Sequence, residues 1–133
     1  MFIEKVCFAI DNNTDTHVLA KFMRLIDTGK AMNNVRGNVI SCIGAYDGLL
    51  EPSYIMDKRD FNEVVKNSGY VDNQECILEI PSDTRQPCTL LYKNGDVKSV
   101  GAMYSISKED AMSVTSWKYV METGTYYTTK GEV

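Results

Sequence analysis

An acidic residue and a tyrosine flank a short turn within residues 38–57, NVISCIGAYDGLLEPSYIMD. We expect two strands here, with Glu51 at the start of the second strand and Tyr46 facing it across the turn. Pro52 follows Glu51 and favours an extended backbone at the glutamate. A carboxylate held by a strand can be aimed at a bound molecule with little entropic loss. Glu51 and Tyr46 are therefore candidate catalytic residues, although a solvated turn acid and a packing tyrosine would show the same spacing.

Small and polar residues near two expected strands are candidates for ligand binding. Residues 41–45, SCIGA, are small enough to let a ligand approach the backbone, although packing of the strand against a helix explains them almost as well. Asp11 and Asn12 follow the first expected strand, where polar groups commonly meet ligands, but turn and helix-cap chemistry also accounts for both. The candidate substrate-binding residues are Ser41, Cys42, Gly44, Asp11, Asn12, Tyr54 and Gln74.

The histidine and cysteine content argues against several other kinds of site. His17 is the only histidine, which argues against a His-rich metal site and against a Ser-His or Cys-His nucleophilic triad. The four cysteines lie far apart in apolar stretches, so they form neither a CxxC redox pair nor a zinc knuckle. They are Cys7, Cys42, Cys76 and Cys88. We expect buried free thiols in a reducing compartment.

Charge and length limit the class of protein further. The chain of 133 residues has 14 basic and 18 acidic residues and a net charge of -4. The basic residues are scattered, which argues against binding to duplex nucleic acid. No apolar run approaches the ~20 residues that span a bilayer, and the N-terminus lacks a signal-peptide pattern. We expect a soluble cytoplasmic protein with a single domain over residues 1–133.

The hydrophobic pattern predicts alternating strands and helices. The expected elements are a strand over residues 2–10, a helix from residue 16, the two strands within 38–57, a helix from residue 58 and a strand over 74–80. This βαββαβ order predicts an α+β, ferredoxin-like fold, with both helices on one face of an antiparallel sheet. Strands over 88–92, 97–104 and 123–129 would extend the sheet, and Asn94-Gly95 favours a tight turn between the first two.

Four segments of residues 5–101 together resemble a known enzyme family. They are CFAIDNN after the opening strand, SCIGAYDG with Glu51 nearby, QECILEI and TLLYKNG. In this order they resemble the small phage-encoded S-adenosylmethionine lyases, formerly called S-adenosylmethionine hydrolases. The loop before Glu51 is short for the family, so Tyr54 is the next tyrosine to consider in place of Tyr46.

The resemblance implies cleavage of S-adenosylmethionine to 5'-methylthioadenosine and L-homoserine lactone, without a metal or another cofactor. In this reaction the substrate's own carboxylate attacks its γ-carbon. Glu51 would hold the α-amino group or the ribose hydroxyls, and Tyr46 would orient the reacting end. The resemblance further implies a homotrimer with the site between subunits. It also implies an anti-restriction role, in which loss of S-adenosylmethionine from the host cytoplasm starves restriction and methylation enzymes.

Three alternatives remain open at this point. Glu51 could act as a general base for water, which would make the protein a hydrolase that releases homoserine. A non-catalytic nucleotide-binding antidefence protein would return its ligand unchanged and would favour Arg and Lys near the pocket, but residues 38–57 contain neither. An inhibitor with an acidic face would need clustered acids, whereas those of this chain are dispersed.

Overall fold

The computed structural model describes residues 4–46 and 48–129, with Tyr46 described by its backbone alone. Its strands are β1 (Lys5–Phe8), β2 (Ile40–Tyr46), β3 (Leu49–Asp57), β4 (Cys76–Ile80), β5 (Cys88–Tyr92), β6 (Val97–Gly101), β7 (Met103–Ile106), β8 (Trp117–Val120) and β9 (Thr125–Thr129). Its helices are α1 (Thr16–Ala31), α2 (Lys58–Asp60), the π-helical turn η1 (Phe61–Val65) and α3 (Lys108–Ala111). Within this part of the chain, no helix has both the length and the apolar character that crossing a membrane requires.

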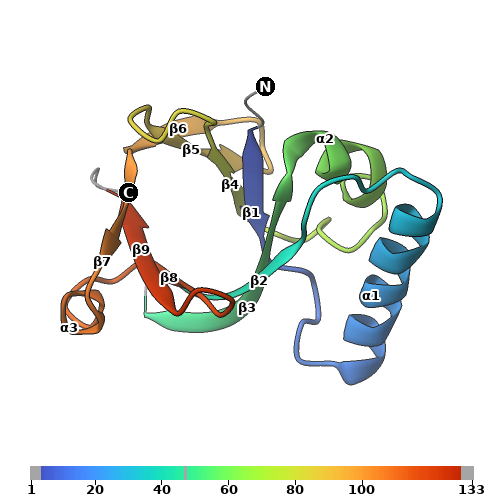
Figure 1. Ribbon diagram of the computed structural model, residues 1–133, viewed down its shortest axis with the longest axis horizontal. Helices are drawn as coiled ribbons and strands as arrows, with labels where there is room; N and C mark the ends of the chain where they lie inside the picture. Colours follow the sequence, from blue (N-terminus) through green and yellow to red (C-terminus); the bar gives the residue numbers. More distant parts are fainter. Residues whose placement is uncertain (1–3, 47, 130–133) are drawn as a thin grey trace.

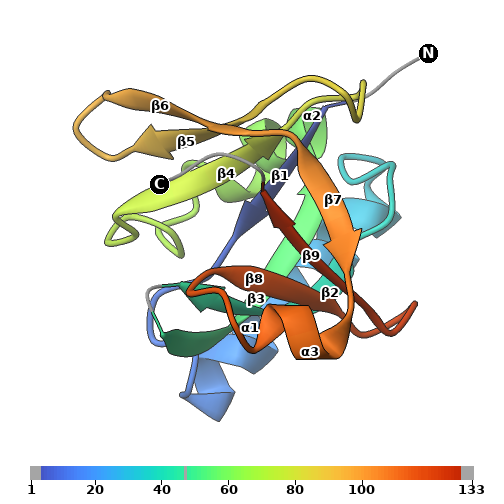
Figure 2. The same ribbon diagram turned by 90° about the vertical axis from the view of Figure 1, so that its left-hand side faces the viewer.

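The nine strands of the described chain form one curled sheet in the order β6-β5-β4-β1-β3-β2-β8-β9-β7. Every pairing between neighbours is antiparallel. The sheet rolls into a nearly closed barrel (Figure 1). Its two edge strands, β6 and β7, are separated in the sequence by Ala102 alone, so the chain passes directly from one edge to the other (Figure 2). The positive φ of 80° at Gly101 allows the bend at this corner.

The predicted ferredoxin-like fold is wrong. The predicted order of strands and helices is found up to β4, but the sheet does not remain a four-stranded layer with helices over one face. Strands β5 and β6 extend it beyond β4, while β8, β9 and β7 extend it beyond β2. Because both extensions curl toward each other, the inner face of the sheet closes on itself. The predicted strand over 97–104 is divided into β6 and β7, and β8 had not been predicted.

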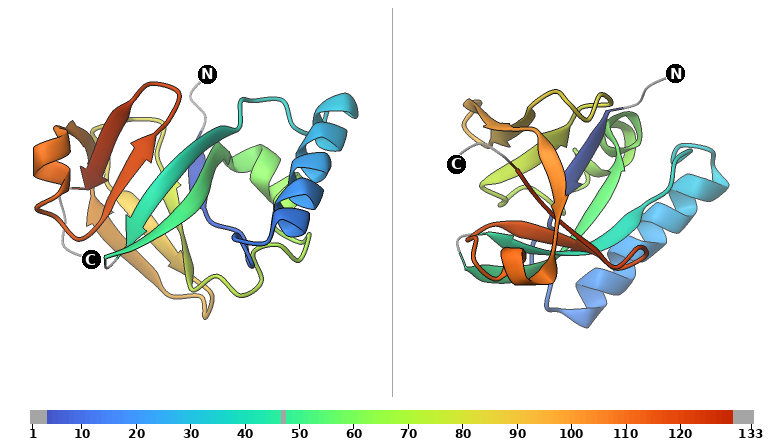
Figure 3. Two further views of the ribbon diagram at one scale, coloured as in Figure 1. Left: turned by 90° about the horizontal axis from the view of Figure 1, so that it is seen from below. Right: turned by 60° about the vertical axis from the view of Figure 1, so that its left-hand side comes forward.

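Helices α1 and α2 cover only the β1–β3 side of the barrel, from outside (Figures 1 and 3). Asp15 is the N-cap of α1, because its carboxylate accepts hydrogen bonds from the backbone N–H groups of His17 and Val18. The buried face of α1 packs on the outward side chains of β1 and β3. This outer core consists of Val6, Phe8, Ile10, Phe22, Ile26, Val35, Tyr54, Met56, Phe61 and Val65.

A second core fills the barrel. Its buried members are Cys7, Cys42, Ile55, Leu78, Cys88, Leu90, Val100 and Val120, and Cys76 packs against them. Strand alternation explains the division, because Cys7 points inward between the outward-facing Val6 and Phe8. All four cysteines are free, as predicted, and all contribute to this interior cluster.

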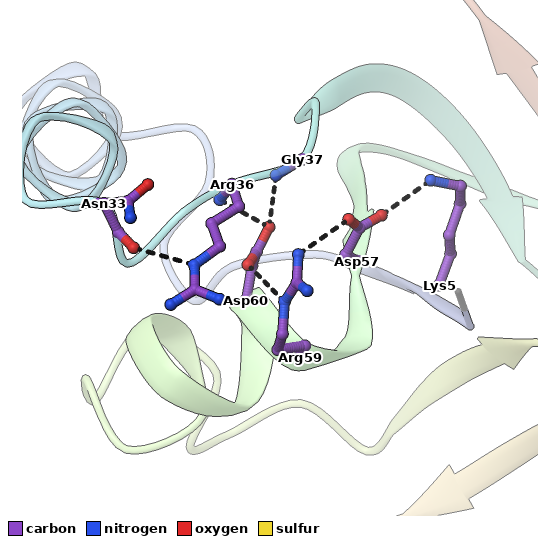
Figure 4. Close-up of polar contacts among 7 residues, drawn as sticks. All are labelled: Lys5, Asn33, Arg36, Gly37, Asp57, Arg59 and Asp60. Atoms are coloured by element: carbon purple, nitrogen blue, oxygen red, sulfur yellow. Dashed lines mark hydrogen bonds and ion pairs between the residues drawn. The ribbon is translucent and has the colours of Figure 1, made fainter. Parts of the chain in front are cut away.

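A buried carboxylate pair holds the start of α2 (Figure 4). Asp57 lies at the N-cap position of this helix, but its side chain makes no capping hydrogen bond and instead accepts one from Lys5 Nζ at 2.9 Å. Asp60, only 1% exposed, accepts hydrogen bonds from the backbone N–H groups of Arg36 at 3.1 Å and Gly37 at 2.9 Å. Asp60 therefore holds the segment before β2 against α2, which directly follows β3.

Candidate active site

Glu51 lies where β3 extends past the end of β1. The last pair between these strands joins Phe8 to Tyr54, and β3 continues beyond it. Because side chains alternate along a strand, Glu51 points to the same side as Ser53 and Ile55. Ile55 belongs to the interior core, and Glu51 is half-buried. The predicted catalytic acid therefore faces the inside of the barrel.

A cavity of about 230 Å³ lies beside Glu51. It is formed at the end of the barrel where β1 ends and β4 begins, together with β3, β5 and β8. Its polar or charged lining residues are Glu51, Ser53, Gln74, Glu75 and Lys118. The other lining residues are Cys7, Phe8, Ala9, Cys76, Leu78 and Leu90. Charged and polar groups thus share the cavity wall with apolar side chains and two thiols, a mixed lining that can hold a small polar molecule.

Lys118 reaches this cavity from β8, opposite Gly44 of β2. A Cβ atom on Gly44 would lie 3.9 Å from Lys118 Nζ and 3.2 Å from Ser53 Oγ. Gly44 itself pairs with Glu51 on its other side. The missing side chain of Gly44 therefore leaves room for the lysine head beside the strand that carries the glutamate.

The charge of Lys118 is maintained by its neighbours. Desolvation is the largest effect on its pKa and lowers it, because burial disfavours the charged form. The negative charges of Cys7 and Glu51 act in the opposite direction, and the net result is a pKa above the ordinary value of 10.5. Lys118 is consequently an ammonium group inside the barrel, within the electrostatic reach of Glu51.

Cys7 and Cys42 form a thiol pair on the same inner wall, with their Sγ atoms 4.0 Å apart. The hydrogen bond from Cys42 lowers the pKa of the Cys7 thiol, burial opposes this effect, and the Lys118 charge lowers the pKa further. The pKa of Cys42 is raised, chiefly by its hydrogen bond to Cys7 and by burial. In this arrangement Cys42 keeps its proton and Cys7 carries the negative charge.

Asp11 and Gln74 come together at the mouth of the cavity. Asp11 Oδ1 accepts a hydrogen bond of 2.7 Å from Gln74 Nε2, and Asp11 Oδ2 accepts one of 3.0 Å from the backbone N–H of Asn73. Gln74 lines the cavity, so Asp11 orients a residue of the candidate site. Asn12 is exposed in a left-handed conformation with φ 55° and is not among the lining residues.

The remaining predicted residues lie in different places. Cys42 faces the interior beside Cys7, whereas Ser41 points outward and is exposed. Tyr54 belongs to the outer core, where its ring centroid lies 4.9 Å from that of Phe22 of α1, on the face of β3 opposite to Glu51. Tyr46 pairs with Leu49 through its backbone, and its side chain lies outside the described part of the structure.

Lys118, Cys7 and Ser53 were not among the predicted site residues. Lys118 lies in Trp117–Val120, WKYV, where an alternating pattern of the kind typical of a strand was present but was not used. Cys7 and Ser53 had not been considered as an acid or a base of the site. Only the closure of the sheet shows that the three share a cavity with Glu51.

Another groove, of about 490 Å³, lies outside the barrel between η1 and strands β4 and β5. Lys66 and Lys93 are among its lining residues, as is Gln74, but Glu51 is not. The interior cavity is therefore the one that contains the predicted acid. Among the described residues, no group of three or more His, Cys, Asp or Glu side chains could hold a metal ion.

The interior cavity suits a ligand that carries charges of both signs. Glu51 and the Cys7 thiolate can face positive groups, and Lys118 can face a negative one. The apolar side chains among the lining residues, Phe8, Leu78 and Leu90, lower the local dielectric constant and strengthen these interactions. Such a site orients and desolvates a molecule that already contains its reacting groups.

Comparison with known proteins agrees with this chemistry. A search of curated proteins returns no match. A family model described as the S-adenosylmethionine lyase family matches residues 8–130, which include β2, β3 and all the lining residues except Cys7. The substrate of this family is a small molecule with a sulfonium, an ammonium and a carboxylate group. The chain therefore belongs to the S-adenosylmethionine lyase family and is an S-adenosylmethionine lyase.

Proposed function

We propose that this enzyme converts S-adenosylmethionine to 5'-methylthioadenosine and L-homoserine lactone. A carboxylate oxygen of the substrate forms a bond to its γ-carbon, and the bond from that carbon to sulfur breaks. The electron pair of the broken bond remains on sulfur, which becomes the neutral thioether of methylthioadenosine. No proton is transferred, so the reaction needs neither an acid nor a base from the protein.

The position of Glu51 in a cavity that it shares with Lys118 and several apolar side chains supports this proposal. Attack of the carboxylate on the sulfonium arm brings opposite charges together, so removal of water from these two groups on binding favours the transition state over the hydrated ground state. Folding the arm into a ring-closing conformation also removes entropy before the reaction. In this scheme Glu51 holds the α-ammonium group or the ribose hydroxyls, and Tyr46 orients the reacting end.

The other predicted residues contribute to binding in this proposal. Gln74, oriented by Asp11, offers a polar group at the cavity mouth. Cys42 and Gly44 do not line the cavity themselves but lie behind it, Cys42 against the lining residue Cys7 and Gly44 beside Ser53 and Lys118. Ser41, Asn12 and Tyr54 do not line this cavity, so in a single chain they would act indirectly.

Product analysis tests the reaction. The purified protein is incubated with S-adenosylmethionine, and the products are followed over time by chromatography and mass spectrometry. Lactone that precedes homoserine supports intramolecular attack. Homoserine without earlier lactone would instead identify a hydrolase with Glu51 as general base, and recovery of unchanged ligand would identify a binding protein.

Two substitutions test the roles of the site residues. Glu51→Gln and Tyr46→Phe should each reduce turnover by at least about tenfold, a barrier increase of about 1.4 kcal/mol, while circular dichroism shows an intact fold. Glu63→Gln is the matched control, because Glu63 is exposed on η1, away from the cavity. Full activity of the Glu51 variant would contradict the proposed role of this acid.

We infer further that the working enzyme is a homotrimer with the substrate between subunits. A cavity of about 230 Å³ is smaller than the roughly 300–1,000 Å³ of typical ligand sites, so a second subunit would complete it. Leu49 and Leu50, immediately before Glu51, are 75% and 67% exposed, and a neighbouring copy would cover them. Sedimentation equilibrium should give three times the chain mass, and a monomer at micromolar concentration would contradict the proposal.

The biological role that fits this activity is anti-restriction by a phage protein in the host cytoplasm. Depletion of S-adenosylmethionine would deprive restriction and methylation enzymes of a substrate. Expression of the wild-type protein in bacteria should lower the cellular S-adenosylmethionine content and increase infection by unmodified phage. Expression of Glu51→Gln should change neither quantity, and infection that increases equally with this variant would contradict the role.

A further inference from the structure

Lys118 presents a half-buried cation that has no carboxylate ion-pair partner in the described part of the chain. The ion pairs formed there by Lys5, Lys58, Arg59 and Arg85 do not include it. Its neighbours are instead the thiol pair and Glu51, whose negative charges favour the protonated lysine. A buried ammonium is costly unless anionic or hydrogen-bonding groups surround it, so Lys118 has capacity for a further anion.

The surroundings of Lys118 leave space for such an anion. The residue lines both the 230 Å³ cavity beside Glu51 and a smaller interior cavity of about 60 Å³ next to Trp117 and Tyr127. Leu78 and Leu90 also line both cavities, which are therefore adjacent. The ammonium group lies beside Gly44, 3.9 Å from the place that a Cβ would occupy, so a larger side chain at this position would extend toward it. A ligand in the cavity thus meets a cation at its inner wall and an acid on β3.

We propose that Lys118 binds the carboxylate of S-adenosylmethionine and so selects ligands that carry this group. This inference rests on the proposed function, because it assigns one end of the substrate to a residue of the same cavity. Glu51 and the Cys7 thiolate then face the cationic sulfonium and ammonium groups, so each charge of the substrate meets an opposite charge.

This contact is compatible with the lactone-forming reaction. A single ammonium holds one carboxylate oxygen, and the other oxygen remains free to form the bond to the γ-carbon. The carbon–sulfur bond breaks as before, its electron pair stays on sulfur, and Lys118 keeps its proton throughout. Lys118 therefore orients the nucleophile without acting as an acid or a base.

A pair of ligands that differ only in the carboxylate tests the proposal. S-adenosylhomocysteine has the carboxylate but lacks the sulfonium leaving group, and its decarboxylated analogue lacks both. Calorimetric titration gives the dissociation constant of each ligand for the wild type, for Lys118→Met and for the control Lys21→Met, which removes an exposed lysine of α1. A charged hydrogen bond contributes about 1.5–3 kcal/mol, which corresponds to a preference of roughly tenfold to a hundredfold for the carboxylate ligand.

The wild type and Lys21→Met should show this preference, and Lys118→Met should bind both ligands about equally. A preference that survives in Lys118→Met, or that is absent from the wild type, would overturn the assignment. Because Lys118→Met leaves Glu51 and Cys7 without their nearby cation, circular dichroism checks that this variant is folded, and Lys118→Gln serves as a second variant if the Met protein is unfolded. Product analysis separates the two proposals: a wild type that selects the carboxylate but releases no lactone would refute the proposed reaction and leave the Lys118 site supported.

Discussion

Gly44 of β2 and Lys118 of β8 are direct partners in the sheet, and the lysine ammonium lies 3.9 Å from the place that a Cβ on Gly44 would occupy. The same Cβ would lie 3.7 Å from the backbone oxygen of Glu51. Gly44 therefore lies between the strand that carries the acid and the strand that carries the cation, and a Cβ there would meet Ser53 Oγ most closely, at 3.2 Å. This function of Gly44 depends on its lack of a side chain rather than on its backbone flexibility.

Gly44→Ala should impair catalysis more than folding. The new methyl group would lie 3.2 Å from Ser53 Oγ, a tight contact inside the barrel, and would narrow the space around Lys118. Overpacking of this kind costs about 1–3 kcal/mol, so we expect kcat/KM to fall by roughly tenfold or more with a modest loss in thermal midpoint.

The double variant Gly44→Ala with Ser53→Ala is the matched control for this prediction. Removal of the Ser53 hydroxyl, which donates to the backbone oxygen of Glu51 at 3.4 Å, relieves the closest contact of the new methyl group. Partial recovery of kcat/KM is expected. Equal activity of the wild type and Gly44→Ala would show that the space over Gly44 is not needed.

The Cys7 thiol should ionise at a lower pH than an ordinary cysteine. The Cys42 hydrogen bond and the Lys118 charge lower its pKa below the usual 9.0 despite burial. Thiolate absorbance in the ultraviolet should therefore rise below pH 9.0 in the folded wild type. This rise should be absent from Cys7→Ser and shifted to higher pH in Cys42→Ala and Lys118→Met; unchanged titration in both of the latter would contradict the arrangement.

The same pKa difference predicts the sign of a stability change. The folded thiol has the lower pKa, so the unfolded chain binds more protons between that pKa and 9.0. The free energy of unfolding should therefore increase with pH over this interval, and the contribution should be lost as the pH falls through the folded pKa. Comparison of urea unfolding between the wild type and Cys7→Ser at several pH values isolates the contribution of Cys7 ionisation to the free energy of unfolding.

Local sequence patterns predicted the elements that are determined by residues close to one another in the sequence. Val18, Phe22 and Ile26 repeat at helical spacing and lie on the inward side of α1. Asn94-Gly95 forms the turn between β5 and β6, with φ 94° at the glycine. In each case the residues that determine the structure lie within a few positions of one another, so the pattern is visible in the sequence alone.

Closure of the barrel depends on pairings that no local pattern contains. The pair Gly44–Lys118 joins segments far apart in the chain, and WKYV is too short to identify its partner strand. The sequence therefore indicated that Glu51 and Gln74 are polar residues near strand ends, and the structure places both beside one cavity. It did not indicate that Lys118 faces Glu51, because this relationship exists only after β8 has paired with β2.

Asp60→Ala should destabilise the fold strongly. The substitution removes the acceptor for the backbone N–H groups of Arg36 and Gly37 and leaves Arg59 without one of its two carboxylate partners. Loss of these contacts should cost about 2–4 kcal/mol, which urea unfolding can measure. Asp83→Ala is the control, because its exposed ion pair with Arg85 should leave the unfolding midpoint unchanged. Equal effects of the two substitutions would contradict the structural role of Asp60.

Tyr54 provides the final test, because it belongs to the outer core and not to the catalytic cavity. Its ring packs against Phe8 and Phe22 on the outer face of β3, and burial raises the pKa of its hydroxyl. Tyr54→Phe keeps the ring and should retain wild-type kcat/KM, whereas Tyr54→Ala should lower the free energy of unfolding by about 3–5 kcal/mol, as is typical of a buried aromatic residue.

The comparison with Tyr46→Phe completes this test. If Tyr46 orients the substrate, the loss of its hydroxyl should lower kcat/KM while Tyr54→Phe remains active, and both proteins should unfold at the wild-type midpoint. The reverse result, with only Tyr54→Phe inactive, would mean that the tyrosine hydroxyl used in catalysis comes from the helix-covered face of β3. Because Glu51 points to the other face of the strand, the two residues could then meet a substrate only across two different chains.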